Sequence, residues 1–334
     1  MKAMVLAAGL GLRMRPLTLL RAKPALPVLG RPLLQHTIER LAKAGVRDVV
    51  VNLHHLPESV VEALGDGRRQ RLRILYSFER EILGTGGGPR RVREFFGRAP
   101  FLLVNGDVFF DFDLRSLVAR HGSSGALATL ALRQKPAADG YSPVVTDRRG
   151  RILSISGRPQ PSRGTVSMFA GVHVLDPRLL ERLPQGVSDS VRDLYLPLLA
   201  EGAFIVGVRG AGAWYDFGRP SLYRDAQLRM LRGRGRQVLT GSGARVARAA
   251  AVRRSVLGAK SRVAKGARVE QSVVWEGAAV EDDARVFRSI VTTGAVVRAG
   301  ERAVNVIVLP LGTLGLDELT GVERHGDMAW VGIE

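Results

Sequence analysis

The residue types best suited to chemistry lie near the start of the chain, where an apolar run over residues 2–8 leads into Gly9 and Gly11. The run ends in small residues at Ala8 and is typical of a buried parallel strand. Glycine has no Cβ atom, so backbone N–H groups beside it can approach an anion closely. The pattern predicts a loop that binds phosphate.

Two cations follow these glycines. The guanidinium of Arg13 can bind phosphate oxygens through two parallel hydrogen bonds, and Lys23 supplies a compact charge later in the chain. An ordinary strand-to-helix turn and a dinucleotide-binding loop are the alternatives. Met14 replaces the third glycine of GxGxxG, and no acidic residue follows about 20 residues later to bind a ribose. The residues therefore favour the phosphates of another nucleotide.

Two acidic residues lie at the ends of apolar runs. Asp107 follows the predicted strand 101–104, and Asp216 ends an apolar run between Trp214 and Gly218, before a predicted helix. Ligands of open α/β sheets bind at the carboxyl ends of the strands. Each acid alone is more often a helix cap or a turn residue. Together they could hold one Mg²⁺ ion whose coordination shell is completed by substrate phosphates.

A second glycine-rich stretch runs from Leu83 to Gly88, after a predicted strand that begins near Tyr76. A flat backbone surface with unpaired N–H and C=O groups can bind the edge of a nucleobase or a ribose. The alternative is a flexible loop that caps the following helix.

Composition narrows the class of protein. The chain has 334 residues, of which 46% are hydrophobic, and it has no cysteine, which excludes disulfides, zinc–thiolate sites and thiol nucleophiles. The formal net charge is +19, but only six of the 50 basic residues are lysines and the arginines are scattered along the chain. We therefore expect no nucleic-acid partner. The chain shows no signal peptide and no membrane-spanning run, so a cytoplasmic location is expected.

Residues 1–232 alternate between short apolar runs and amphipathic segments, which predicts a doubly wound α/β domain. A Gly/Arg-rich stretch over 231–237 breaks the pattern and predicts a linker. The predicted strands are 2–7, 47–52, 72–77, 101–104, 125–132, 165–175 and 203–208, and the predicted helices are 31–44, 57–64, 88–96, 113–121, 176–182, 190–200 and 219–231.

From 238 to 310 apolar residues recur with spacings of six, five and six, which gives a period of 17 residues. Three inward positions in each repeat predict a three-sided parallel β-helix of about four coils. None of the six histidines lies in these coils, so acyl transfer is disfavoured and packing, regulation or assembly into a homo-oligomer is expected. Residues 311–334 form an extension that could cap the last coil. The three positions are occupied by Val246, Val263, Val280 and Val297; Val252, Val269, Val286 and Ala303; and Leu257, Val274, Val291 and Val308.

The combined motifs resemble those of the nucleoside-diphosphate-sugar pyrophosphorylases, which are sugar-1-phosphate nucleotidyltransferases. The resemblance covers essentially the full length of the chain. Within the family, the chain is similar to mannose-1-phosphate guanylyltransferase-like members with a C-terminal left-handed β-helix. The resemblance implies a Rossmann-like catalytic domain. The motif G-x-G-x-R-M-x-P-L-T with a later K-P matches Gly9 to Thr18 and Lys23-Pro24; L-G-T-x-G matches Leu83 to Gly87; G-D matches Asp107; and W-x-D-x-G matches Trp214 to Gly218.

This resemblance implies the reaction of an NTP with a sugar 1-phosphate to give an NDP-sugar and pyrophosphate, with Mg²⁺ as cofactor. GTP with mannose 1-phosphate is the first expectation. UTP or dTTP with glucose 1-phosphate, a muramate-type uridylyltransferase and a catalytically silent homologue that binds an NDP-sugar are alternatives. The implied residues are Arg13 and Lys23 for catalysis; Ala8, Gly9, Gly11, Leu83, Gly84, Thr85 and Gly86 for the nucleotide; Asp107 and Asp216 for the metal; and Gly140, Arg158 and Gly171 for the sugar phosphate.

One position departs from the family pattern. Many members carry an E-K-P stretch whose lysine holds the sugar phosphate, and the matching stretch here is Ser156-Gly157-Arg158-Pro159. Arginine presents a planar fork of donors where lysine presents a point charge, so the geometry of this contact differs from that of the family.

Overall fold

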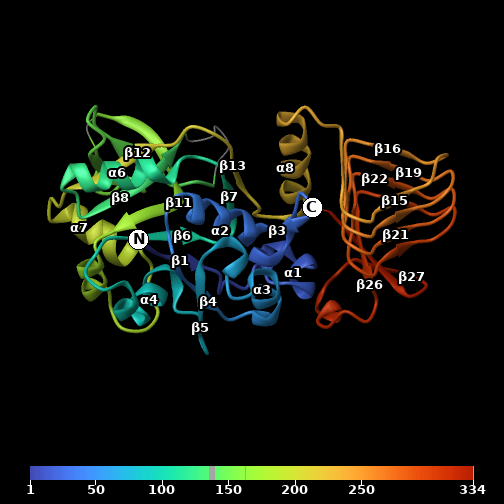
Figure 1. Cartoon of the computed structure of the whole chain (residues 1–334), viewed down its shortest axis with the longest axis horizontal. Coiled ribbons are helices and arrows are strands. Elements are labelled where there is room, and N and C mark those ends of the chain that lie inside the picture. The colour runs from blue at the N-terminus through green and yellow to red at the C-terminus, as the bar shows by residue number, and fades with distance from the viewer. Residues whose placement is uncertain (135–139, 162, 334) are drawn as a thin grey trace. The chain divides into compact units, whose positions relative to one another are not determined.

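The chain forms two compact units that are interleaved in sequence (Figure 1). This computed structural model describes residues 1–134, 140–161 and 163–333, so the last residue of the predicted 311–334 extension lies outside it. The first unit comprises Met1–Leu10 and Leu34–Tyr215, and the second comprises Gly11–Leu33 and Asp216–Glu334. The predicted domains, 1–232, 238–310 and 311–334, are continuous in sequence and stay a prediction.

The first unit is built on a nine-stranded mixed sheet, which agrees with the predicted α/β fold. Its centre is parallel, because β1 pairs with both β4 and β6, and β4 pairs with β5. The strands β1, β4 and β6 are nearly continuous apolar runs, as expected for strands buried on both faces. Along the sheet the strands are β10 (Ile152–Ile155), β9 (Pro143–Thr146), β11 (Thr165–Leu175), β6 (Phe101–Asn105), β1 (Lys2–Leu6), β4 (Asp48–Leu53) and β5 (Arg73–Phe78), while β8 (Ala128–Arg133) pairs with β11 and β12 (Ile205–Arg209).

The helices of this unit follow the predicted segments with three differences, the first of which is that the predicted helix 190–200 begins as a π-helix over Val191–Tyr195. The predicted helix 176–182 is a 3-10 helix, and the predicted helix 88–96 begins earlier, at Gly84, and is divided at Val92. Pro89 lacks a backbone donor, and the first part ends two residues after it. The elements are α2 (Leu33–Lys43), α3 (Pro57–Leu64), η3 (Arg68–Gln70), α4 (Gly84–Arg91), α5 (Arg93–Phe96), α6 (Leu114–Ser124), η4 (Pro177–Arg182), the π-helical η5 (Val191–Tyr195) and α7 (Leu196–Ala200).

A separate two-stranded sheet pairs β7 (Val108–Phe110) with β13 (Trp214–Asp216). Asp111 N donates to Ala213 O over 3.0 Å, so the end of β7 meets the start of β13 and the strands run antiparallel. Trp214 Nε1 donates to Ala170 O over 3.0 Å, which joins this ribbon to β11. Strands of three residues carry too little periodicity to be predicted from sequence.

The second unit begins with the segment Gly11–Leu33, which has mostly short elements, and continues with the long helix α8. α8 ends at Gly233 and therefore includes the first residues of the predicted linker. No helix in the described parts of the chain is long and apolar enough to cross a membrane. The elements are η1 (Leu12–Met14), α1 (Leu17–Leu20), η2 (Lys23–Ala25), β2 (Pro27–Val28), β3 (Arg31–Pro32) and α8 (Pro220–Gly233).

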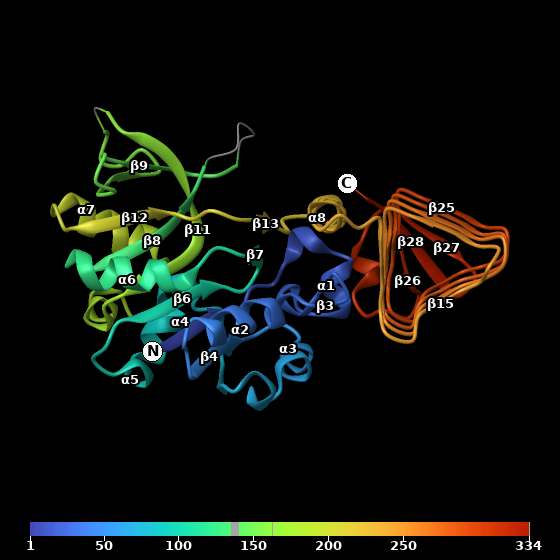
Figure 2. The ribbon, with the colours of Figure 1, turned by 45° about the horizontal axis from the view of Figure 1, so that its top comes forward.

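The predicted 17-residue register is confirmed in the triangular stack of coils that Figure 2 shows. Val246, Val263, Val280 and Val297 are register partners on successive strands. Val246 is 41% exposed, because it belongs to the first coil and has no coil on its other side. The three sheets contain β14 (Val238–Thr240), β17 (Ser255–Leu257), β20 (Val273–Val274), β23 (Ile290–Val291) and β26 (Val306–Pro310); β15 (Arg245–Val246), β18 (Arg262–Val263), β21 (Ala279–Val280) and β24 (Val296–Val297); and β16 (Ala251–Arg253), β19 (Arg268–Glu270), β22 (Arg285–Phe287) and β25 (Arg302–Val304).

Buried polar groups also repeat along the β-helix. Ser272 N donates to Ser255 Oγ, and Ser289 N donates to Ser272 Oγ, over 3.2 and 3.1 Å. These hydroxyls satisfy backbone groups that the turn of each coil leaves without a strand partner. The chain after the last coil continues the first of the three sheets as an antiparallel hairpin, with η6 (Leu316–Glu318) before it and strands β27 (Val322–His325) and β28 (Met328–Gly332).

One histidine lies wholly inside the core of the first unit. His173 on β11 is 0% exposed, and its Nδ1 contacts the hydroxyl of the equally buried Tyr195. In the described structure Nε2 of this ring is buried without a hydrogen-bond partner. Burial lowers the pKa of His173 from 6.5 to about 3, because the charged ring would lose its hydration.

This burial predicts a dependence of stability on pH. Between about pH 6.5 and pH 3 the unfolded chain binds a proton that the folded chain does not, so the free energy of unfolding falls as the pH falls. We expect His173→Gln to reduce this slope by up to about 1.4 kcal/mol per pH unit, measured by urea unfolding at several pH values. His55→Gln, at a half-buried position, is the control. Equal slopes in wild type and His173→Gln would contradict the argument.

Candidate functional site

The predicted phosphate loop starts where β1 ends. A Cβ atom at Gly9 would meet no atom of the described structure within 4 Å, so the backbone there is open to a ligand. Gly11 has φ +64°, and a Cβ atom would lie 2.8 Å from Thr18 Cγ2 and 3.2 Å from Lys23 Cβ. Glycine is therefore required at this position both by the backbone conformation and by the close approach of Lys23.

Two predicted site residues of the second unit lie together. Lys23 begins η2 and is 8% exposed, and its Nζ lies 3.6 Å from Oδ1 of Asp216 at the end of β13. A lysine so far removed from water needs an opposite charge nearby. Arg13 lies in η1 with its side chain exposed. The structure thus joins Lys23 to Asp216 and leaves Arg13 accessible to a ligand.

Asp107 is placed by the glycine before it. Gly106 N donates to Leu6 O over 2.8 Å, and a Cβ atom at Gly106 would lie only 2.5 Å from that oxygen. The turn from β6 to β7 therefore packs directly on the end of β1, and Asp107 is half-buried in this turn. In the ranges that the structure describes, no group of three or more His, Asp or Glu side chains could hold a metal ion.

The glycines of the second predicted loop pack against residues 186–188. A Cβ atom at Gly84, which has φ +76°, would lie 2.5 Å from Ser188 O, and one at Gly87 would lie 2.2 Å from Gly186 O. Gly86 N donates to Ser188 O over 2.9 Å. Close packing of two backbones is thus sufficient reason for these glycines, so the glycine pattern alone does not demonstrate a base-binding surface.

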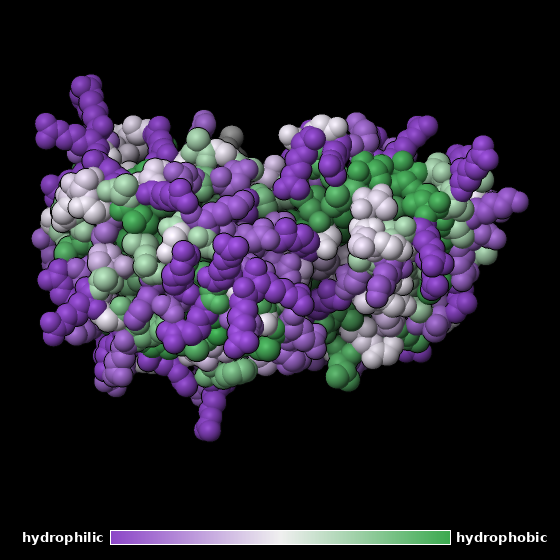
Figure 3. Space-filling view, in the orientation of Figure 1, coloured by the Kyte–Doolittle hydropathy of each residue, from purple (hydrophilic) through white to green (hydrophobic). Residues whose placement is uncertain are grey.

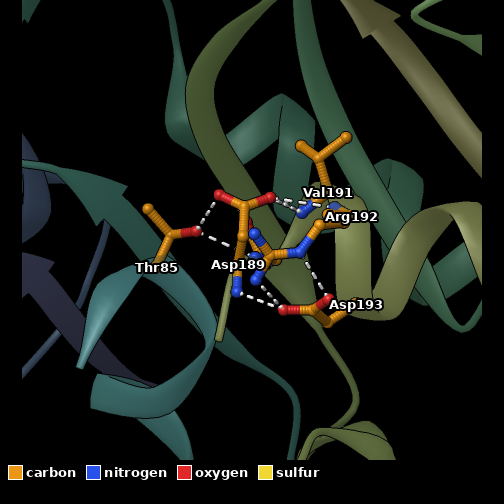
Figure 4. A network of polar contacts seen from close by, with 6 residues as sticks. Thr85, Asp189, Val191, Arg192 and Asp193 are labelled. Carbon is orange, nitrogen blue, oxygen red and sulfur yellow. Dashed lines mark hydrogen bonds and ion pairs between the residues drawn. The ribbon is translucent and has the colours of Figure 1, made fainter. Parts of the chain in front are cut away.

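Thr85 joins this loop to a network of polar contacts (Figure 4). Its Oγ1 donates to Asp189 Oδ2 over 3.0 Å and accepts from Ser190 N over 2.8 Å. Asp189 N donates to Asp193 Oδ2 over 2.7 Å, and Arg192 binds both oxygens of the Asp193 carboxylate. Hydrogen bonds from Arg192 lower the pKa of Asp193 to about 2. The network fixes the start of α4 to the segment before η5.

A buried chain of hydrogen bonds, which no sequence prediction included, forms a bridge between the two predicted loops. Ala7 N donates to Asn52 Oδ1 over 2.8 Å, and Asn52 Nδ2 donates to Glu79 Oε1 over 2.8 Å. The other oxygen of Glu79 accepts from Leu83 N over 3.0 Å. Asn52 and Glu79 are 2% and 4% exposed. A polar residue at the end of the apolar run 49–51 was the available signal.

The predicted sugar-phosphate residues are only partly brought together. Gly171 lies at a β-bulge of β11 with φ +76°, and a Cβ atom there would lie 3.0 Å from Asn105 Nδ2, two residues before Asp107. Tyr141, which follows the exposed Gly140, packs edge-on against Trp214 with 5.6 Å between ring centroids.

Arg158 lies in the turn that follows β10. It closes a tight turn with Ile155, in which each backbone N–H donates to the other residue's carbonyl over 3.0 Å, and its side chain is exposed.

Comparison with known proteins links this arrangement to nucleotide transfer. The family model described as nucleotidyl transferase matches residues 2–233, and the model described as GlmU-like C-terminal hexapeptide matches residues 228–304. A UTP–glucose-1-phosphate uridylyltransferase from Synechocystis is 33% identical over 68% of this chain and 62% of its own length. A mannose-1-phosphate guanylyltransferase from Mycobacterium tuberculosis is 34% identical over 69% of this chain and 65% of its own length. The match thus spans less than two thirds of these relatives.

A solved structure supports the fold. A chain from Bacillus anthracis, described as a glucose-1-phosphate thymidylyltransferase in complex with sucrose, superposes with a TM-score of 0.59. The match covers 68% of this chain and 93% of that one at 20% sequence identity. At that identity the likeness concerns the fold alone.

The buried bridge predicts a specific effect of Glu79→Gln. Both Glu79 oxygens accept hydrogen bonds, but glutamine offers one oxygen and one NH₂ group, so one donor loses its partner. We expect a loss of about 1–3 kcal/mol in the free energy of unfolding, measured with urea. Glu81→Gln, at an exposed position two residues away, is the matched control and should change little. Equal stability of both variants would remove Glu79 from this role.

Proposed function

Because the chain belongs to the nucleotidyl transferase family, we propose that it transfers a nucleotidyl group from an NTP to a sugar 1-phosphate, which yields an NDP-sugar and pyrophosphate. The observation that carries the proposal is the buried Lys23, which lies beside Asp216 and packs against Gly11, where the missing Cβ atom leaves room for its side chain. Burial of a lysine without an opposite charge is costly, and Asp216 supplies that charge here. A cation of this kind also suits a substrate that carries several negative phosphates.

In the proposed reaction a phosphate oxygen of the sugar 1-phosphate attacks the α-phosphorus of the NTP. A new P–O bond forms, and the bond from the α-phosphorus to the bridging oxygen of pyrophosphate breaks with its electrons on pyrophosphate. Lys23 lies near the α-phosphate, where negative charge grows, and Arg13 binds the departing pyrophosphate. Backbone N–H groups around Ala8, Gly9 and Gly11 orient the triphosphate. Catalysis then rests on positioning and on charge stabilisation, without a covalent intermediate on the protein.

Asp107 and Asp216 are the proposed ligands of Mg²⁺. Two carboxylates, with phosphate oxygens of the substrate, form the all-oxygen donor set that this ion prefers. The antiparallel pairing of β7 and β13 supports the choice of these acids, because the start of one strand in such a pair lies beside the end of the other. Asp107 precedes the first residue of β7, and Asp216 is the last residue of β13. When bound, the ion would offset phosphate charge.

The relatives and the predicted loops support a proposal for the specific substrates. We propose GTP and mannose 1-phosphate, with Leu83, Gly84, Thr85 and Gly86 at the nucleotide and Gly140, Gly171 and Arg158 at the sugar phosphate. UTP or dTTP with glucose 1-phosphate, and a muramate-type substrate, are the alternatives, since the similar proteins include uridylyl- and guanylyltransferases.

A matrix of each NTP against a panel of sugar 1-phosphates, followed by pyrophosphate release, separates these alternatives. Absence of turnover with tight binding of an NDP-sugar would instead support the catalytically silent homologue.

Other expectations from the sequence stay predictions. Hydrophilic side chains are spread over the face shown in Figure 3. The proposed absence of a nucleic-acid partner rests on the scattered arginines of the sequence. A cytoplasmic location, the absence of a membrane partner and assembly into a homo-oligomer belong to the same proposal.

The proposed metal ligands can be tested separately. Asp107→Asn and Asp216→Asn should each lower Mg²⁺-dependent pyrophosphate release about a thousandfold or more, because each removes a charged oxygen ligand while it preserves shape. Asp317→Asn, at an exposed position in η6, is the control. Circular dichroism should show an unchanged fold. Near-normal turnover in either active-site variant would exclude that acid from the metal site.

The two cations should act mainly on kcat. Lys23→Ala and Arg13→Ala remove charges that meet the negative charge developing on the α-phosphate and the leaving group, so kcat should fall while KM for the NTP changes little. Steady-state kinetics with the best NTP measures both constants, with Arg69→Ala at an exposed position as the control. A change in KM alone would assign the residue to ground-state binding.

A further inference from the structure

We propose that the β-helix acts as a positioning scaffold for the catalytic segment Gly11–Leu33, through a clamp formed by Arg21, Glu276 and Thr293. This inference rests on the proposed function, which assigns catalytic roles to Arg13 and Lys23. All of the contacts involved lie within the second compact unit.

The clamp joins one arginine of the segment to two coils. Arg21 Nη2 binds Glu276 Oε1 and also donates to Thr293 Oγ1 over 3.0 Å. Thr293 Oγ1 donates to the same Glu276 oxygen over 2.8 Å. The side chains of Arg21 and Glu276 are 26% and 36% exposed, so solvent screens this ion pair only in part. The Arg21 guanidinium also lies 5.4 Å from the ring centroid of the buried Trp275.

The clamp depends on the regular stacking of the coils. Glu276 and Thr293 are 17 residues apart and occupy equivalent positions in successive coils, next to the inward residues Val274 and Val291. Their side chains can therefore meet the same guanidinium only while the coils keep their register. The position of the Arg21 side chain thus depends on the register of the coils. Lys23 lies two residues later in the same segment, so its position depends on that register as well.

A second set of contacts, which includes Trp275 but none of the three clamp residues, holds the end of the segment. Trp275 Nε1 donates to Tyr223 Oη on α8 over 3.1 Å, and that hydroxyl donates to Pro27 O. Gln227 on α8 accepts from Leu29 N over 2.8 Å. Tyr223, Gln227 and Trp275 are each at most 1% exposed. Burial raises the pKa of Tyr223 well above its usual value, so its hydroxyl keeps the proton that it donates.

A third contact is weaker. Arg15 forms an ion pair of 2.7 Å with Glu318 of η6, but the two side chains are 32% and 59% exposed. Exposed pairs of this kind contribute little to stability. The Arg21 clamp is therefore the contact to change, because Arg21 lies between Arg13 and Lys23 in sequence and itself contacts two coils.

Arg21 and Glu276 are positioning residues in this proposal. We expect Arg21→Gln and Glu276→Gln each to lower kcat about tenfold or more, with KM for the NTP within about twofold of the wild type, because a small displacement of Lys23 costs rate more than binding. The double variant should be no worse than either single one, since both remove the same contact. Thr293→Val, which keeps both charges, should act in the same direction with a smaller effect.

Glu270→Gln is the matched control. It makes the same chemical change within the β-helix, at an ion pair with Arg254 that is 3.0 Å long and does not involve the segment. Its kcat should equal that of the wild type.

Hydrogen exchange provides a readout that does not need activity. Amides of residues 11–26 should exchange several-fold faster in Arg21→Gln and Glu276→Gln than in the wild type and in Glu270→Gln. Unchanged exchange of these amides would overturn the inference, whatever happens to kcat. If the wild type turns over none of the tested substrates, the proposed function fails, and the exchange data still decide whether the β-helix positions this segment.

Discussion

The hydrogen bond from Ala7 N to Asn52 Oδ1 fixes the backbone where the chain leaves β1 and enters the predicted phosphate loop. A backbone amide at the end of a central strand has no ladder partner, and burial without one would cost free energy comparable to a lost hydrogen bond. Asn52 meets this need and passes the constraint through Glu79 to Leu83 N. One buried carboxylate thereby sets the spacing between two loops that are far apart in sequence.

The boundary between the compact units falls between Leu10 and Gly11, inside the predicted phosphate loop. The residues before it are fixed by the sheet and by Asn52, whereas those after it are fixed by α8 and the coils. The coils and α8 thus supply tertiary contacts to the segment after the boundary. The segment Gly11–Leu33 has only short elements, so most of its order must come from tertiary contacts.

Sequence patterns predicted the elements whose period is long enough to be measured. The helix at 57–64 and the 17-residue register of the coils are both observed, because each repeats an apolar spacing over several turns or coils. The strands β7, β9, β10 and β13 were missed because three or four residues define no period. The contacts between polar side chains were missed for another reason. Asn52 and Glu79 are 27 residues apart and Arg21 and Glu276 are 255 residues apart, so no local sequence pattern predicts either contact.

Glycine shows why motif and mechanism must be argued separately. At Gly11 and Gly106 a Cβ atom would strike Thr18 and Leu6, which are residues of the phosphate loop and of the strand that delivers it. At Gly84 and Gly87 the obstacle is the backbone of residues 186–188, which is a matter of packing. The same residue type in different family motifs therefore meets two different physical requirements. Of these glycines, Gly11 directly affects the position of a charged group. Because Gly11 has no Cβ atom, the Lys23 side chain can pack against it, and the Lys23 ammonium group lies near the Asp216 carboxylate.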